Sequence, residues 1–295
     1  MMKIAFVTPW YGKIPGGMEA LTRQTAERLA ARGWPVEVLT TCIRDFFADW
    51  EKNVHLAGVT EENGVVVRRF PVEGRDGGVF AELNQKLMVG ERLTAAQEQT
   101  FLNEMFRAPA LFAYMSEQQA DYLFLPIPYM FPTTFLGGQI APERTAIIPC
   151  LHDEAYARMG VFKEVIPQVN SLIFLSEAEG KLSEQLYGAP HDQCRQVIGM
   201  GVESDFTADA ERFRQKYGLT ESRFLLYAGR KIAGKNLPLL VDYWRRYAGE
   251  RPGCTHKLVL IGPGEFALPD DLQDVVVDLG FVPLQDKYDA YAAAV

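Results

Sequence analysis

Residues 224–235 have the sequence FLLYAGRKIAGK. The apolar run that ends at Ala228 is typical of a short buried strand, and it leads directly into Gly229 and Arg230, with Lys235 five positions further on. In an open parallel sheet, ligands bind beyond the carboxyl ends of the strands, and an Arg with a Lys held there suits a diphosphate. The alternative is a surface loop whose two cations are merely solvated, since exposed Lys and Arg are common.

The composition predicts a globular protein of about two domains, because 48% of the 295 residues are hydrophobic and 23% are charged. A net charge of -8 argues against nucleic acid as a partner, since binding to a phosphate backbone needs clustered Lys and Arg. No apolar run reaches the roughly 18 residues of a membrane-spanning helix. Met1-Met2-Lys3 leads into a predicted strand and not a signal peptide, so we expect a cytoplasmic protein.

The four cysteines predict neither a zinc site nor a disulfide framework, because they lie far apart and include no CxxC pair. They are Cys42, Cys150, Cys194 and Cys254.

Short apolar runs alternate with amphipathic stretches along the chain, which is the pattern of βαβ units and a mostly parallel sheet. A first series has expected strands at 3–9, 36–40, 65–72, 122–127, 145–151, 171–175 and 195–198. Its helices are expected at 18–32 and over 80–115, the latter interrupted by Gly90 and Pro109. A second series has expected strands at 224–228, 257–261 and 275–278 and helices at 208–217, 237–248 and 284–294. We therefore predict an α/β protein with two Rossmann-like domains, 1–199 and 200–295, and a hinge at 199–206 that carries two glycines.

A second candidate loop follows the first predicted strand, where Pro15-Gly16-Gly17 precede a helix. Paired glycines there let a phosphate approach backbone N–H groups and the positive end of the helix. The loop has neither GxGxxG spacing nor a P-loop Lys-Ser/Thr, so a simple tight turn is the alternative. Two Rossmann-like halves that face each other across a cleft can bind a ligand between their strand ends.

Taken in order, these segments resemble the retaining glycosyltransferases of the GT-B fold, specifically the large family 4 of nucleotide-sugar-dependent enzymes. The resemblance runs over almost the whole chain and depends on the order and spacing of several short motifs. These are Pro15-Gly16-Gly17 with Glu19, Arg32-Gly33 with Val36-Glu37-Val38, Leu151-His152-Asp153, Ser176-Glu177, 198–202, Ala228-Gly229-Arg230 with Lys235-Asn236, 260–264 and 279–282.

The resemblance implies an acceptor-binding domain at 1–199 and a donor-binding domain at 200–295. Arg230 and Lys235 would hold the donor diphosphate and stabilise the charge that grows on the leaving nucleotide. Gly16 and Gly17 would offer backbone N–H groups to the same phosphates as the cleft closes. His152 would lie beside the transferred sugar, although a lone His at a strand end is equally compatible with a structural role.

Further positions follow from the same resemblance. Gly262 and Gly264, together with the backbone near Phe281 and Val282, would border the base and ribose of the donor. Asp153 would orient the His152 imidazole or, as the favoured interpretation, cap the following helix.

The resemblance implies a mechanism without cofactor or required metal. Asp270-Asp271 falls in a polar loop and is interpreted as a solvated helix start, and cationic side chains would do the electrostatic work of a metal. Retention in this family is attributed to front-face attack assisted by the leaving phosphate, so no protein nucleophile is assigned.

The acceptor would be a glycan or a lipid-linked sugar, in bacterial surface polysaccharide or glycoconjugate synthesis. Trp10, Tyr11 and Tyr129 are predicted to contact it, because aromatic faces suit sugar rings. Further aromatic residues fall in or near the same predicted loops: Phe46, Phe47, Trp50 and Phe131. The segment 80–115 lacks a strongly basic face, so we expect at most weak peripheral membrane contact.

In the family, a further strand and a loop with two glutamates eight positions apart follow the segment that here ends at Val295. We therefore expect the second domain, with three strands, to be the less stable half. We also expect these 295 residues to be weakly active or inactive by themselves.

Two other functions remain open. A GT-B-like sugar-nucleotide epimerase would need a pair of acid/base carboxylates, which the sequence does not identify. A non-catalytic protein that binds nucleotide sugars or glycans is the alternative from another class. The donor base, the sugar, the acceptor and the oligomeric state are also left open.

Overall fold

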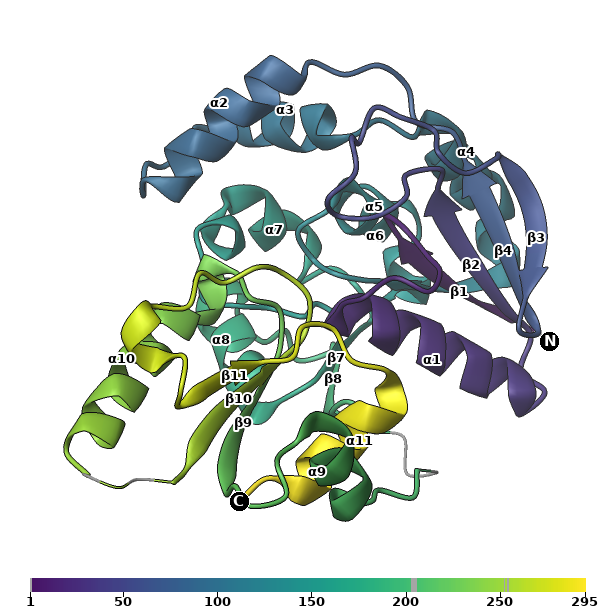
Figure 1. The fold of residues 1–295 in the computed structure, drawn as a ribbon. Coiled ribbons are helices and arrows are strands. Elements are labelled where there is room, and N and C mark those ends of the chain that lie inside the picture. The colour runs from purple at the N-terminus through teal and green to yellow at the C-terminus, as the bar shows by residue number, and fades with distance from the viewer. Residues whose placement is uncertain (1, 203–205, 252, 254) are drawn as a thin grey trace. The chain divides into compact units, whose positions relative to one another are not determined.

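The computed structural model describes residues 2–202, 206–251, 253 and 255–295 (Figure 1). Met1, Cys254 and the 203–205 part of the predicted hinge lie outside these ranges. The chain divides into two compact units, unit 1 from Met1–Gly201 and unit 2 from Val202–Val295.

The strands of unit 1 are β1 Lys3–Thr8, β2 Val36–Thr41, β3 Gly58–Glu62, β4 Val65–Phe70, β5 Tyr122–Pro126, β6 Ala146–Ile147, β7 Ser171–Phe174 and β8 Cys194–Val197. Its α-helices are α1 Gly17–Ala31, α2 Gly77–Met88, α3 Ala95–Met105, α4 Pro109–Gln118, α5 Pro132–Phe135, α6 Gly137–Ile140, α7 Gly160–Val165 and α8 Glu177–Tyr187. The strands of unit 2 are β9 Phe224–Ala228, β10 Lys257–Ile261 and β11 Val276–Asp278. Its helices are α9 Ala210–Tyr217, α10 Leu237–Gly249 and α11 Leu284–Ala293. Short 3-10 turns occur at η1 Gln119–Asp121, η2 Pro142–Arg144, η3 Tyr156–Arg158, η4 Ala233–Lys235 and η5 Asp270–Leu272.

Unit 1 contains a five-stranded sheet in the order β3-β4-β2-β1-β5 and a three-stranded sheet in the order β6-β7-β8. All of these neighbours are parallel except the β3–β4 pair. A parallel bridge between Phe124 and Thr145 joins β5 to the residue before β6. The two sheets therefore continue one another, and their parallel strands end at one common edge.

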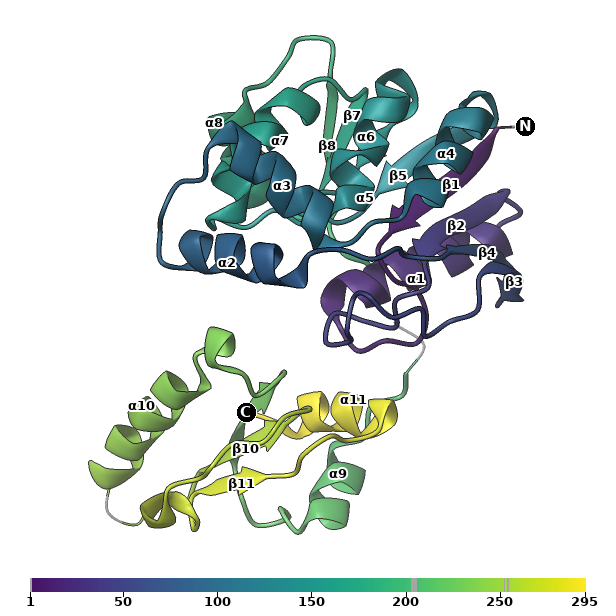
Figure 2. The ribbon, with the colours of Figure 1, turned by 90° about the horizontal axis from the view of Figure 1, so that it is seen from above.

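Helices cover both faces of the main sheet of unit 1, as alternation of side chains along a buried strand requires. On β1, Phe6 packs into a cluster with Ala26 of α1, whereas Val7 packs into a larger cluster with Leu111 of α4. Figures 1 and 2 show α1 along one face of these strands. The long predicted segment 80–115 is divided into α2, α3 and α4, with the breaks at Gly90 and Pro109 confirmed.

Two details of unit 1 differ from expectation. Strand β3 was not predicted, because its residues are polar and exposed, although Asn63 and Gly64, both with positive φ, form a typical hairpin turn. The predicted strand 145–151 is confined to β6, Ala146–Ile147. The chain then leaves the sheet, and Cys150 has a φ of 51°, which is incompatible with an extended strand.

Unit 2 is a parallel three-stranded sheet in the order β11-β10-β9, with helices on both faces (Figure 2). Successive residues of β10 again point to opposite sides. Leu258 packs with Trp244 of α10, while Val259 packs with Phe213 of α9 and Ala290 of α11. Strands β9 and β10 begin and end at the predicted residues.

The carboxyl ends of β9 and β10 approach each other so closely that a glycine is required. A Cβ at position 262 would lie 2.1 Å from the carbonyl oxygen of Gly229, and Gly262 has a φ of 130°. A residue with a side chain is disfavoured at position 262 for two reasons. Its Cβ would lie too close to the Gly229 oxygen, and its backbone would be strained at this φ.

We predict that Gly262→Ala lowers the free energy of unfolding by at least about 2 kcal/mol, because the new methyl group collides with a backbone oxygen. Urea unfolding followed by circular dichroism measures this change. Gly249→Ala is the matched control, since that position is helical, has open space around it, and should change stability little. Equal stability of the two variants would contradict the steric argument.

Helices α9 and α11 are joined by the buried carboxylate of Asp289. Arg212 donates from Nε to Oδ2 at 2.6 Å and from Nη2 to Oδ1 at 2.7 Å, and the backbone N–H of Asp209 donates to Oδ1 at 2.9 Å. The hydrogen bonds from Arg212 are the largest influence that lowers the pKa of Asp289 from 3.8 to about 2. Because the folded-state pKa is depressed, the stabilisation is present above about pH 4 and is lost as pH falls toward 2.

We predict that Asp289→Asn lowers the free energy of unfolding at neutral pH by about 1.5–3 kcal/mol, the range for hydrogen bonds to a charged group. The variant should also lose less stability than the wild type between about pH 4 and 2, because it has no carboxylate to protonate. Urea unfolding at a series of pH values measures both effects. Asp242→Asn, which removes an exposed pair with Arg245, is the control and should change little.

Candidate functional site

The loops at the carboxyl edge of the unit 2 sheet are tied to one another by backbone hydrogen bonds. The N–H of Gly229 donates to Ile261 O at 3.0 Å, and the N–H of Lys231 donates to Pro263 O at 2.9 Å. The N–H of Gly262 donates to Gly280 O at 2.7 Å. The ends of β9, β10 and β11 therefore form one connected rim, where ligands of parallel sheets bind.

Arg230 and Lys235 both lie in the segment of this rim that connects β9 to α10. The backbone oxygen of Arg230 accepts a hydrogen bond of 2.7 Å from the hydroxyl of Tyr227, and the Arg230 side chain is half-buried. Lys235 is exposed and ends η4, directly before Asn236, which precedes the first residue of α10 without a capping side chain. Two cations and the positive end of a helix thus share this segment, an arrangement that attracts an anion.

The same rim contains a buried cation that the sequence did not reveal. Lys231 is buried, and its ammonium pairs with the carboxylate of Asp278 at the end of β11. No spacing rule connects positions 231 and 278, so only the folded sheet could identify this pair.

The other predicted donor-binding positions lie on the same rim with different exposures. A Cβ at Gly264 would be 3.1 Å from Lys231 O, so this glycine also serves the contact between loops. The Phe281 side chain is 72% exposed, whereas Val282 is buried in the core that α11 covers. Only the Phe281 ring is therefore available to a ligand.

In unit 1, the predicted loop Gly16–Gly17 stands at the beginning of α1. Gly16 precedes the helix, and no side chain caps its first turn. The carboxylate of Glu19 folds back over Gly16, where a Cβ would lie 1.9 Å from Oε2. Glu19 is held there by the Trp10 indole, which donates from Nε1 to Oε1 at 3.0 Å. The absence of a side chain at position 16 thus accommodates Glu19.

His152 follows a backbone position that is fixed by a buried carboxylate. Glu179 of α8 accepts from the N–H of Leu151 at 2.7 Å and from the N–H of Leu175 at 2.6 Å. The His152 side chain is exposed, and its ring has no hydrogen-bond partner within the described part of the chain. Glu179 was not predicted, although Ser176 and Glu179 have the S-x-x-E spacing that often marks the start of a helix.

Cys150 connects the two candidate segments of unit 1. Burial, and to a smaller extent the nearby carboxylates of Glu179 and Glu19, raises the pKa of the Cys150 thiol to about 12. The thiol is therefore neutral at physiological pH and unsuited to nucleophilic attack. Because Met18 of α1 and Cys150 pack against the same cluster of buried residues, the start of α1 and the segment before His152 are neighbours within unit 1.

The predicted role of Asp153 is wrong. Its carboxylate pairs with Arg158 and neither caps the following 3-10 helix nor contacts His152. A short segment between Asp153 and Arg158 folds back on itself, so the local ion pair takes the place of the predicted cap.

The three aromatic residues predicted to contact an acceptor are buried. Trp10, Tyr11 and Tyr129 are 1%, 3% and 1% exposed, because Trp10 and Tyr129 pack in the main core of unit 1 and Tyr11 packs in the cluster beneath α1. Their rings present no face to solvent. The exposed rings of this region are Phe46 and Phe47, in the loop after β2, and Phe46 packs on Trp10 at a centroid distance of 6.0 Å.

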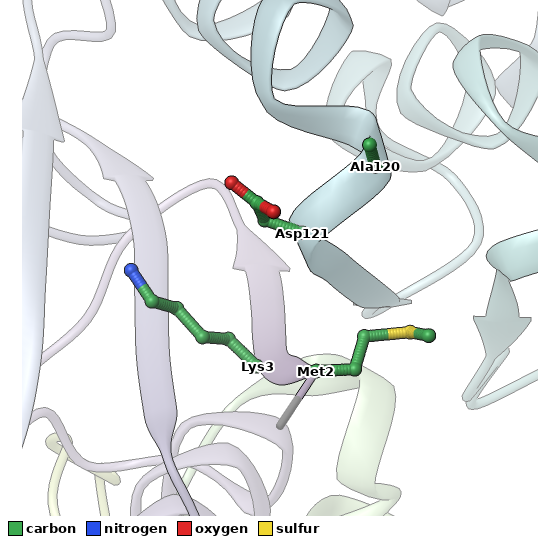
Figure 3. A pocket seen from close by; sticks show the side chains of 4 residues that line it. All are labelled: Met2, Lys3, Ala120 and Asp121. Atoms are coloured by element: carbon green, nitrogen blue, oxygen red, sulfur yellow. The ribbon is translucent and has the colours of Figure 1, made fainter.

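A cavity of about 420 Å³ lies at the opposite edge of unit 1 (Figure 3). It is lined by Met2, Lys3, Ala120 and Asp121, which precede or begin strands β1 and β5. This position is remote from the strand ends that bind ligands in parallel sheets, so we do not assign it to the site.

Neither a metal centre nor a membrane-spanning helix is found in the described ranges. No group of three or more His, Cys, Asp or Glu side chains there could hold a metal ion. No helix within them is long and apolar enough to cross a bilayer.

Comparison with solved structures identifies the architecture. HepE from Anabaena in complex with UDP has a TM-score of 0.62 and 18% identity, over 99% of this chain and 72% of that one. A trehalose-6-phosphate structure from E. coli bound with UDP-2-fluoro glucose has a TM-score of 0.65 and 9% identity, over 99% and 76%. WaaG, a glycosyltransferase involved in lipopolysaccharide biosynthesis, has a TM-score of 0.54 and 14% identity, over 99% and 73%.

The chain has the GT-B fold. This confirms the α/β fold class predicted from the sequence. No protein-family model matches the chain, and no curated protein matches it in sequence. At these identities the likeness establishes the GT-B fold alone, since one fold serves many activities.

We predict that Glu179→Gln lowers the free energy of unfolding by about 1–3 kcal/mol, because an amide has one acceptor oxygen for two backbone donors. Amide hydrogen exchange at Leu151 should become faster, which would report loosening of the backbone before His152. Glu184→Gln on the exposed side of the same helix is the control. The structural role of Glu179 is refuted if both variants behave as the wild type does.

Proposed function

We propose that this protein transfers a sugar from a nucleotide-diphosphate sugar to an acceptor hydroxyl with retention, as in glycosyltransferase family 4. The observation that carries the proposal is the position of Arg230 and Lys235 between β9 and α10, at the carboxyl edge of a parallel sheet. Two of the structures that share the GT-B fold hold UDP or a UDP-sugar analogue, which supports a uridine nucleotide as the first donor to test.

In the proposed reaction, the bond from the anomeric carbon to the phosphate oxygen breaks, and a bond to the acceptor oxygen forms on the same face. The acceptor hydroxyl gives its proton to the leaving phosphate. Arg230 and Lys235 stabilise the negative charge that grows on the diphosphate, which is the largest contribution expected in such a step. No protein nucleophile is needed.

Residues of unit 1 have supporting roles in this proposal. Gly16 and Gly17 offer backbone N–H groups to the phosphates, and Glu19 has to move away from Gly16 for the first of these contacts to form. The His152 ring, which is exposed and unpaired within the described residues, is available to contact the transferred sugar. On the rim of unit 2, Gly262, Gly264 and the backbone near Phe281 and Val282 border the nucleoside, with the exposed Phe281 ring beside it.

The acceptor in this proposal is a glycan or a lipid-linked sugar of bacterial surface polysaccharide or glycoconjugate synthesis. Since Trp10, Tyr11 and Tyr129 are buried, we assign the aromatic contact to the exposed rings of Phe46 and Phe47. Aromatic faces pack well on the apolar faces of sugar rings.

We predict that Arg230→Ala weakens UDP binding at least about tenfold, because a hydrogen bond to a charged group contributes roughly 1.5–3 kcal/mol. Isothermal titration calorimetry with UDP, UDP-glucose, GDP and GDP-mannose measures the affinity and the base preference. Arg223→Ala is the matched control, since Arg223 is an exposed arginine immediately before the amino end of the same strand, β9. Equal affinities of the two variants would remove the diphosphate assignment.

The same samples distinguish an enzyme from a binding protein. Slow release of glucose from UDP-glucose, observed by NMR with the α-anomer appearing first, would support retaining transfer. First appearance of the β-anomer would exclude retention. Binding without any release would favour a non-catalytic nucleotide-sugar binder.

A further inference from the structure

The ion pair between the buried Lys231 and the partly exposed Asp278 has no part in the proposed chemistry, yet it lies on the unit 2 rim. The Lys231 side chain is 1% exposed, and its ammonium donates to Oδ1 of Asp278. Burying a charge is unfavourable unless a partner of opposite charge receives it. The ordinary position for a lysine after a strand is in solvent, so its enclosure here requires an explanation.

One oxygen of the Asp278 carboxylate accepts hydrogen bonds from two loops. Its Oδ1 also accepts the N–H of Gly280 at 2.9 Å, within the turn that follows β11. Lys231 belongs to the loop that follows β9. The pair therefore connects the first and the third strand ends of the sheet, across the loop of the middle strand, β10.

Lys231 is adjacent to Arg230, and the backbone around both residues is held at several points. The N–H of Lys231 donates to Pro263 O at 2.9 Å, and the Tyr227 hydroxyl donates to Arg230 O at 2.7 Å. Gly264 allows the β10 loop to approach Lys231, since a Cβ there would lie 3.1 Å from Lys231 O. The side chain of Lys231 adds a direct tie from the β9 loop to the end of β11, beside the backbone bond from Gly262 to Gly280.

We infer that Lys231 is a positioning residue, which acts through its ion pair with Asp278 to hold the backbone of Arg230 in a fixed place on the rim. Direct contact of Lys231 with a ligand is disfavoured, because its ammonium is enclosed and committed to Asp278. A loop fixed before binding loses less conformational entropy when a ligand binds. The effect on ligands rests on the proposed function, whereas the fixation of the loop does not.

Hydrogen exchange of the unliganded protein tests the fixation directly. In Lys231→Met, backbone amides at positions 229 and 231 should exchange about tenfold faster or more, because the loop opens locally when its tie to β11 is lost. Lys216→Met is the matched control, since Lys216 pairs with Asp286 in the same unit but is half-exposed and far from the rim in sequence. Exchange in Lys231→Met that equals the wild type would overturn the inference.

Lys231→Met leaves Asp278 as an unpaired charge, which could destabilise unit 2 as a whole. A double variant separates this general effect from the local effect on the loop. Lys231→Met with Asp278→Asn removes both charges but retains an oxygen for the Gly280 N–H. Its urea midpoint should return toward the wild type, while exchange at positions 229 and 231 stays fast. Exchange restored together with the midpoint would show that Lys231 contributes general stability only, and would overturn the inference.

A thermodynamic cycle with UDP tests whether Lys231 acts through Arg230. The double variant should bind UDP about tenfold more weakly than the wild type, but in an Arg230→Ala background the same two changes should cost less than about twofold. Equal losses in both backgrounds would overturn a role through Arg230. If the wild type binds no UDP, the proposed function fails and hydrogen exchange alone decides the inference.

Discussion

The contact between the backbone oxygen of Gly229 and the Cα of Gly262 constrains the whole carboxyl edge of unit 2. A side chain at position 262 would collide with that oxygen, at a distance of 2.1 Å. Because the two loops can approach this closely, the N–H of Gly229 finds an acceptor at the end of β10, and the N–H groups of Lys231 and Gly262 find acceptors on neighbouring loops. The rim is thus a hydrogen-bonded extension of the sheet, although its residues are no longer in strands. Arg230 is presented from this hydrogen-bonded rim, as its proposed role as an anion ligand requires.

In unit 1, the backbone at the strand ends is held in place by a different kind of contact. Its strand ends are not tied loop to loop by glycine contacts but by an interior carboxylate, Glu179, which accepts the N–H groups of Leu151 and Leu175. The backbone before His152 is therefore fixed while the His152 ring remains exposed. In both units, the residue with the candidate chemistry is exposed or half-buried, and one buried charged residue, Lys231 in unit 2 and Glu179 in unit 1, helps to hold the backbone beside it.

The glycines and the aromatic residues show where sequence reasoning succeeds and where it needs the fold. Gly16 and Gly17 were identified because paired glycines before a helix allow close approach, whereas Gly262 and Gly264 were implied by the family resemblance. The structure contains close approaches at three of the four, Gly16, Gly262 and Gly264. What approaches is protein in each case, namely Glu19 at Gly16, Gly229 at Gly262 and Lys231 at Gly264. A sequence pattern reports the requirement for space but not the group that occupies it. Likewise, Trp10, Tyr11 and Tyr129 lie beside strand ends, but whether an aromatic ring faces solvent or the core depends on neighbours far away in the chain.

By itself, the sequence determined the α/β class, the boundaries of β9 and β10, the breaks in the helical segment at Gly90 and Pro109, and the place of Arg230 after a strand. That strand was predicted to be buried, but β9 is an edge strand in which only Phe224 is buried. These features are encoded by local periodicity and by the backbone restrictions of glycine and proline, which act over a few residues. Only the tertiary structure decided that Lys231 is buried against Asp278, that Glu179 holds Leu151, and that Asp153 turns to Arg158. The first two depend on strands or helices that are distant in sequence, and the third depends on how a short loop closes. Hydrogen bonds and ion pairs of this kind depend on which polar groups lie close together in the folded protein. The periodicity of hydrophobic residues along the sequence does not contain that information.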